Sequence, residues 1–105
     1  MAKKPRSLGL GTLAVLKTVR DGPAYGLEIM AATGQPSGTV YPALGRLEER
    51  GFVTAHWESS STARKEARPR RRYYRITANG SKELAAALAR LLALNAPFTP
   101  RHAGP

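Results

Sequence analysis

The spacing of apolar residues changes along this chain, and the order of the changes restricts its fold more than any other feature. Val40, Leu44 and Leu47 are four and three residues apart, which places them on one face of a helix. Residues 53–57 (VTAHW) and 72–77 (RYYRIT) instead alternate between apolar and other side chains, which is the spacing of β-strands. A helix followed by two strands therefore predicts a helical domain with an adjoining β-hairpin.

Proline, glycine and capping residues divide the remaining sequence into further helices. Ser37 and Thr77 are suitable N-caps for the third and the last helix. The expected order is helix, helix, helix, strand, strand, helix, with the helices at 8–19, 24–33, 37–50 and 78–95. Residues 59–70 are polar and lack an apolar period, so we expect a loop between the strands. The prediction is a mainly α fold with a small β-hairpin (α+β), arranged as a winged helix-turn-helix.

The length of 105 residues indicates a single domain. We expect a flexible basic arm at 1–7, a winged-helix domain at 8–95 with a dimerisation helix at 78–95, and a loose tail at 96–105. No apolar run reaches the roughly 18 residues needed to cross a bilayer, so we expect no membrane partner. A cytoplasmic, nucleoid-associated protein is the corresponding expectation.

The positive charge of the chain is concentrated in one segment. The net charge is +10, and residues 64–75 carry six of these ten charges. This clustering favours a polyanionic partner, nucleic acid before an anionic membrane surface. We expect no enzyme, cofactor or metal site: His56 and His102 lie far apart, there is no cysteine, and Ser59–Ser61 have no base beside them.

The outward face of the third helix carries very little side chain. Gly38, Pro42 and Gly45 fall opposite the apolar face, so the helix backbone can come close to a partner such as DNA. The residues that flank this face can donate hydrogen bonds: Thr39, Tyr41 and Arg46. The alternative interpretation is that glycine and proline simply mark a weak, bent helix at the surface.

Three segments together resemble the PadR family of bacterial transcriptional regulators: DGPAYGLEI (21–29), SGTVYPALGRLEERGFV (37–53) and RPRRRYYRITANG (68–80). The resemblance implies a winged helix-turn-helix that binds double-stranded DNA as a homodimer and usually represses. In some relatives an aromatic residue near the dimer centre lines a pocket, so a small-molecule effector, unknown here, is a possible partner. The chain departs from the family pattern at Ala67, where a glycine is common.

By position, the resemblance and the helix geometry together indicate which residues contact DNA. Those in and before the third helix are Tyr25, Ser37, Gly38, Thr39, Tyr41 and Arg46, and those in the wing are Arg68, Arg70, Arg71 and Arg72. The dimer interface is expected at the first and last helices, at Leu8, Leu84, Leu88, Leu91 and Leu92. The leucine stripe of the last helix has an alternative role, which is to complete the core of one protomer.

These observations predict a sequence-specific transcriptional regulator, a repressor that binds an inverted-repeat operator through residues 37–50 and the basic wing. The alternative is a small basic protein that binds RNA, the ribosome or DNA without sequence preference.

Overall fold

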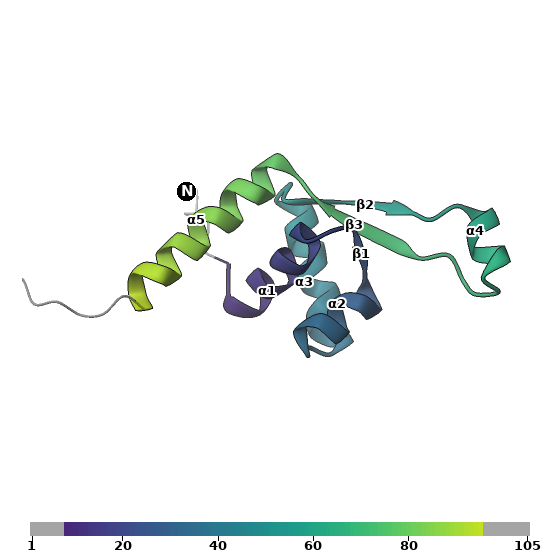
Figure 1. Cartoon of the computed structure of the whole chain (residues 1–105), viewed down its shortest axis with the longest axis horizontal. Coiled ribbons are helices and arrows are strands. Elements are labelled where there is room, and N and C mark those ends of the chain that lie inside the picture. The colour runs from purple at the N-terminus through teal and green to yellow at the C-terminus, as the bar shows by residue number, and fades with distance from the viewer. Residues whose placement is uncertain (1–7, 96–105) are drawn as a thin grey trace, which may run out of the picture.

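The computed structural model describes residues 8–95, and the arm and tail predicted from the sequence lie outside this range. The described elements follow one another as α1 (Leu10–Arg20), β1 (Ala24–Tyr25), α2 (Gly26–Thr33), α3 (Ser37–Glu49), β2 (Val53–Trp57), α4 (Ser60–Lys65), β3 (Arg72–Ile76) and α5 (Ala78–Asn95). In Figure 1, α1, α2 and α3 form the centre, α5 extends to one side, and the β2–β3 hairpin extends to the other. This is the predicted winged helix-turn-helix arrangement, with two additional elements.

The predicted apolar face of α3 forms the centre of the core. Val40, Leu44 and Leu47 are all buried, and Leu16 of α1 and Ile29 of α2 are buried in the same cluster. α3 packs on both α1 and α2, which fixes its outward face on the opposite side. The helical period of the sequence therefore predicted correctly which side of α3 is buried.

The expectation that the second helix begins at Ala24 is wrong. Ala24 and Tyr25 form the short strand β1, which pairs antiparallel with Tyr74 and Tyr73 of β3. The sheet therefore has three strands in the order β1–β3–β2, instead of the two strands of a simple hairpin. Ala24 is buried in the sheet. The burial of Ala24 and its backbone hydrogen bonds to β3 stabilise the strand more than two further helical residues would stabilise α2.

The expectation of a loop at 59–70 is also wrong in part, because residues 60–65 form the short helix α4. The Ser59 hydroxyl accepts a hydrogen bond from the backbone N–H of Thr62 at 3.2 Å, which caps the start of α4. Ala63 is the buried residue of this helix. With only one buried residue, α4 has no apolar period by which it could have been recognised in the sequence.

The two predicted helix caps have different outcomes. The N-cap of α3 is Pro36 rather than Ser37, and the backbone N–H groups of Thr39 and Val40 both donate to the Pro36 carbonyl at 3.0 Å. Thr77 caps α5 as predicted, since its hydroxyl accepts from the N–H of Gly80 at 3.0 Å. No helix between residues 8 and 95 combines the length and the hydropathy required to cross a membrane.

Candidate nucleic-acid interface

The outward face of α3 is open to solvent, as the sequence predicted. Gly38 and Pro42 are exposed, and a Cβ atom added at Gly38 or Gly45 would meet no atom within 4 Å. Ser37 and Thr39 in the first turn are also exposed. A partner can therefore approach the backbone of α3 closely, with two hydroxyl groups at its N-terminal end.

Two of the flanking side chains point elsewhere than expected. Tyr41 is about half exposed, and its hydroxyl lies against Gly26 at the start of α2, where any Cβ atom would overlap it. Arg46 donates from Nη2 to the Thr12 hydroxyl of α1 at 3.3 Å. Arg46 is thus held toward α1, so in this structure it joins two helices instead of extending outward from α3.

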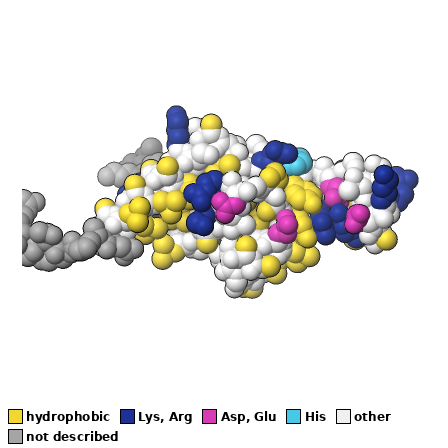
Figure 2. Space-filling view, in the orientation of Figure 1, with side chains coloured by type: hydrophobic (Ala, Val, Ile, Leu, Met, Phe, Trp, Pro, Cys, Tyr) yellow, Lys and Arg dark blue, Asp and Glu magenta, His cyan; other side chains and the backbone are white. Residues whose placement is uncertain are grey.

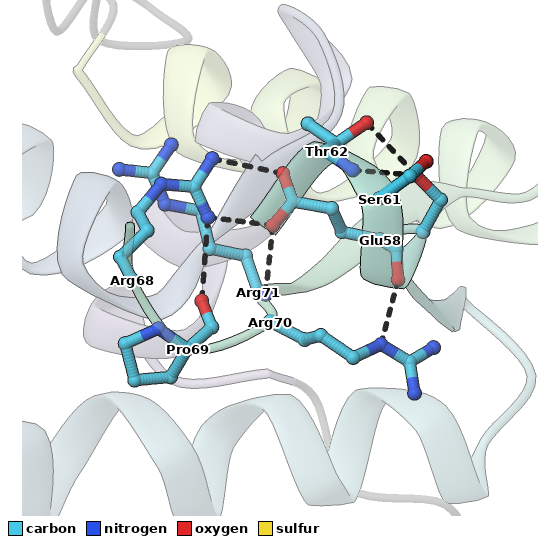
Figure 3. A network of polar contacts seen from close by, with 8 residues as sticks. Glu58, Ser61, Thr62, Arg68, Pro69, Arg70 and Arg71 are labelled. Atoms are coloured by element: carbon cyan, nitrogen blue, oxygen red, sulfur yellow. Dashed lines mark hydrogen bonds and ion pairs between the residues drawn. The ribbon is translucent and has the colours of Figure 1, made fainter. Parts of the chain in front are cut away.

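A cluster of polar contacts around Glu58 closes the base of the α4 segment (Figure 3). We call it the Glu58 clamp, and it consists of Glu58, Arg68, Arg70 and Arg71. Both Glu58 carboxylate oxygens accept from the Arg68 guanidinium, with Nη2 at 2.9 Å from Oε2, and Oε1 also accepts from the Arg71 N–H at 3.2 Å. The Glu58 carbonyl accepts from Arg70 Nε at 2.8 Å. The hydrogen bond from Arg68 is the main cause that lowers the pKa of Glu58 from 4.5 to about 2.

The Glu58 clamp changes the role expected for Arg68. The sequence placed Arg68 at the tip of the wing as a DNA contact, but its side chain is about four-fifths buried and paired with Glu58. Arg68 therefore joins the two sides of the wing below α4. No local pattern pairs Arg68 with Glu58, because ten residues separate them and only the hairpin brings them together.

The other wing arginines lie against aromatic rings. The guanidinium of Arg71 is 4.0 Å from the centre of the Tyr25 ring, which joins the wing to the start of α2. Arg70 and Arg72 lie 5.6 and 5.4 Å from the centre of the Trp57 ring. These contacts hold three cations on one side of the hairpin while leaving part of each side chain accessible.

A groove of about 520 Å³ separates the wing from the helix-turn-helix. One wall comes from the start of α2 and from α3, with Tyr25, Leu27 and Tyr41, and the other from the wing, with Trp57 and Arg71. The groove unites six residues that the sequence predicted separately as DNA contacts: Tyr25, Tyr41, Arg68, Arg70, Arg71 and Arg72. The contributions of Trp57 and Leu27 were missed, because isolated apolar residues in a sequence do not reveal their exposure.

The predicted dimer leucines do not form one equivalent set. Leu84 is buried in the core of the protomer, so it offers no surface to a partner, which is the alternative role considered for this stripe. Leu8, Leu88 and Leu91 are half-buried against the same core. Leu92 is 71% exposed and Leu94, in the same leucine-rich stretch, is 81% exposed, and Leu10, which the sequence did not single out, is 69% exposed. Figure 2 shows hydrophobic side chains gathered over the end of the molecule where α5 lies.

Residues 15–86 match the sequence model of the transcriptional regulator PadR-like family. The chain belongs to the PadR family. The match includes all of α2, α3 and the wing, and the winged-helix arrangement described above agrees with it. As a member of a family of transcriptional regulators, the protein is not an enzyme.

Solved structures of PadR-like proteins have the same fold. A PadR-like transcription factor from Bacteroides fragilis is 26% identical over 80% of this chain and 82% of that chain, with a TM-score of 0.69. A proposed transcriptional regulator from Thermoplasma acidophilum is 32% identical over 82% of this chain and 84% of that chain, with a TM-score of 0.63.

A third similar structure is that of Bacillus subtilis PadR, solved in complex with operator DNA. It is 21% identical over 91% of this chain and 53% of that chain, with a TM-score of 0.67, and at this identity the likeness concerns the fold. No curated protein sequence matches this PadR-family chain significantly.

Proposed function

We propose that this chain is a sequence-specific DNA-binding regulator, a repressor that binds an inverted-repeat operator as a homodimer. The observation that carries the proposal is the shared groove, to which both Tyr41 of α3 and the wing arginines contribute. The B. subtilis PadR structure with operator DNA supports the same use of this fold.

In the proposed complex, α3 enters the major groove with its outward face, which carries Gly38, Pro42 and Gly45, toward the bases. Because Gly38 and Pro42 add little bulk, the backbone can lie near the edges of the base pairs. The hydroxyls of Ser37 and Thr39 then donate to or accept from base edges, which supplies the sequence preference. The N–H groups in the first turn of α3 also favour a nearby phosphate.

The wing supplies contacts that do not depend on sequence. Arg70 and Arg71 border the groove, and Tyr25 lies across from them at the start of α2. A DNA backbone that lies over this groove meets the guanidinium groups of the wing and the phenol hydroxyl of Tyr25. These are phosphate contacts, which position the protein on the duplex and make its affinity depend on salt.

Because α3 is proposed to read the bases and the wing to bind phosphates, substitutions in the two parts should have different effects on DNA binding. Arg70→Ala and Arg71→Ala should weaken binding to operator and random duplex equally, and each should reduce the slope of log K against log salt by roughly 0.9 per protomer. Thr39→Ala should lower the preference for operator over random duplex, with little change in that slope. Fluorescence anisotropy titrations between 50 and 200 mM salt would measure both quantities.

The same titrations distinguish the proposal from its alternative. If the unmodified protein binds random duplex and structured RNA as tightly as DNA from its own promoter, it is a non-specific nucleic-acid-binding protein. An equal loss on all duplexes for Thr39→Ala would contradict the assignment of specificity to α3.

The proposed dimer uses the exposed leucines at the end of α5 and the start of α1. Leu92 and Leu94 are exposed in the single chain, as is Leu10 of α1, and exposed large apolar side chains favour burial against a second copy. Two reading helices would then lie about 34 Å apart, one turn of DNA. Leu8, Leu88 and Leu91 are partly buried against the core and remain proposed contacts with less exposed area.

The double substitution Leu92→Asp/Leu94→Asp should convert the dimer to monomers, because it places four charges in an apolar interface. Both side chains are exposed in the single chain, so the fold should remain intact. Sedimentation equilibrium would report the mass, and circular dichroism would confirm the helix content. A variant that remains dimeric would exclude this surface as the interface.

A further inference from the structure

The groove between the wing and the helix-turn-helix carries more exposed apolar side chain than contact with phosphates requires. Leu27, Tyr41 and Trp57 line it, and they are 64%, 47% and 54% exposed. The function proposed above uses the arginines and the Tyr25 hydroxyl of this groove, and it gives Leu27 and Trp57 no role. Exposed apolar side chains that share one concave surface with a few polar groups are typical of a small-molecule site.

The walls of the groove are held in place by contacts within the chain. Tyr25 makes an edge-to-face contact with Tyr73 of β3, with 5.5 Å between the ring centres. The Tyr41 hydroxyl lies against Gly26, and the Glu58 clamp fixes the base of the wing. The volume of about 520 Å³ is within the range of sites that bind small molecules. The groove is therefore a preformed site that a small organic ligand can fill.

The charges of the groove favour a ligand with two negative charges. Among the described residues, four arginines line it, but Arg68 and Arg72 are each in an ion pair with a glutamate. Within residues 8–95, Arg70 and Arg71 form no ion pair: Arg70 donates to a backbone carbonyl, and the Arg71 guanidinium lies over an aromatic ring. A phosphate monoester carries about −1.5 to −2 charges at pH 7, whereas a carboxylate carries only one. A phosphate monoester therefore matches these two guanidinium groups.

Duplex DNA leaves the apolar part of the groove unfilled. Its bases remain stacked inside the double helix, so its backbone brings only phosphates and sugars to the groove. A planar aromatic group packs instead against the rings of Trp57 and Tyr41, and bases of any kind stack favourably on aromatic side chains. A ligand that satisfies both parts of the groove has a flat aromatic ring system joined to a phosphate, which is the chemistry of a nucleotide.

We propose that this groove binds a free nucleoside monophosphate, with its base on the apolar side chains and its phosphate on Arg70 and Arg71, and that the bound nucleotide excludes DNA. Binding of the nucleotide is independent of the function proposed above, whereas its effect on DNA rests on that function. Because the phosphate of the nucleotide and the DNA backbone require the same guanidinium groups, only one of them binds at a time.

Trp57 reports binding directly, because it is the only tryptophan in the chain. Its fluorescence, excited at a wavelength that adenine does not absorb, should be quenched in a saturable manner by adenosine 5′-monophosphate at constant ionic strength. Adenosine should bind at least about tenfold more weakly, because it lacks the charge-assisted hydrogen bonds of the phosphate. Inorganic phosphate, which lacks the base, should also bind more weakly. Absence of saturable quenching by the nucleotide, or equal affinity for adenosine, would overturn the inference.

Two variants with the same net charge locate the phosphate. Arg71→Ala should weaken nucleotide binding by about tenfold, because it removes a charged hydrogen-bond donor. Arg75→Ala removes the same charge from an exposed position of β3 that does not line the groove, so salt should screen its effect to less than about twofold. Circular dichroism would show that both variants keep their helix content. Equal losses for the two variants would indicate general electrostatic attraction and contradict a phosphate site in the groove.

Competition with DNA tests the second part of the inference. In anisotropy titrations, adenosine 5′-monophosphate should release a labelled duplex at the concentrations that quench Trp57, and adenosine at the same concentrations should not. If the nucleotide quenches Trp57 while the duplex stays bound, the exclusion of DNA is wrong. If the unmodified protein binds no duplex, the function proposed above fails, and the fluorescence titrations still decide whether the groove holds a nucleotide.

Discussion

Replacing Glu58 with alanine is expected to weaken operator binding by roughly tenfold to a hundredfold, although the change removes a negative charge from a DNA-binding surface. The reason is that the Glu58 carboxylate holds the Arg68 side chain and the backbone of Arg71 in place, at the base of the wing. Without the carboxylate, the backbone that carries Arg70 and Arg71 is no longer fixed in the free protein and must be ordered on binding, which reduces affinity. The measurement is the dissociation constant for operator duplex at constant salt.

Glu66 provides the matched control for this prediction. It is an exposed acid on the same wing, outside the Glu58 clamp, so Glu66→Gln removes a charge without releasing an arginine. Glu66→Gln should tighten DNA binding slightly, whereas Glu58→Ala and Glu58→Gln should weaken it. If all three variants tighten binding, then Glu58 contributes only its charge and does not position the wing.

Because the pKa of Glu58 is lowered, the stability that the Glu58 clamp contributes to the folded state depends on pH. Folding lowers this pKa from 4.5 to about 2, so the ionised carboxylate stabilises the folded state above about pH 4.5. This contribution disappears as the pH falls from 4.5 toward 2, and it is constant between pH 5 and 8. The difference in Tm between the unmodified protein and Glu58→Gln should therefore narrow only in the acidic range.

Gly80→Ala should have the largest effect on stability. Gly80 lies in the first turn of α5, where an added Cβ atom would overlap the Phe52 carbonyl oxygen and lie 2.9 Å from its carbon. These are backbone atoms of the turn between α3 and β2, which also accepts a hydrogen bond from the N–H of Thr77 at 2.9 Å. Relief of the overlap requires α5 to move away from the domain. We expect a loss of about 2–3 kcal/mol, or roughly 10–20 °C in Tm.

Gly45→Ala is the control for Gly80→Ala, since it makes the same substitution at a helical glycine with open space around it. In the interior of α3, alanine should raise stability by about 1 kcal/mol because it favours the helix. Thermal unfolding followed by circular dichroism would measure both variants. Equal Tm values for Gly80→Ala and Gly45→Ala would show that the close approach of α5 to Phe52 does not constrain the fold.

The elements that were predicted correctly depend on local patterns. The apolar period of α3, the alternation in β2 and β3, and the Thr77 cap each involve residues close together in the sequence. The same patterns correctly predicted that the face of α3 with Gly38 and Pro42 points outward. The errors occurred where distant segments decide the structure: Ala24 pairs with Tyr74, and Arg68 pairs with Glu58. Neither partner can be identified from local spacing.

The sequence by itself therefore determined the order of the main helices and strands, the buried side of α3, and the location of the basic charge. Periodicity and composition act over a few residues, so these properties can be derived without knowledge of the fold. Only the tertiary structure decided which arginines are available. It buries Arg68 against a carboxylate, turns Arg46 toward α1, and leaves Arg64 and Lys65 exposed on a helix at the tip of the wing. Exposure and pairing depend on what surrounds a side chain in space, and for these residues the surroundings come from other parts of the chain.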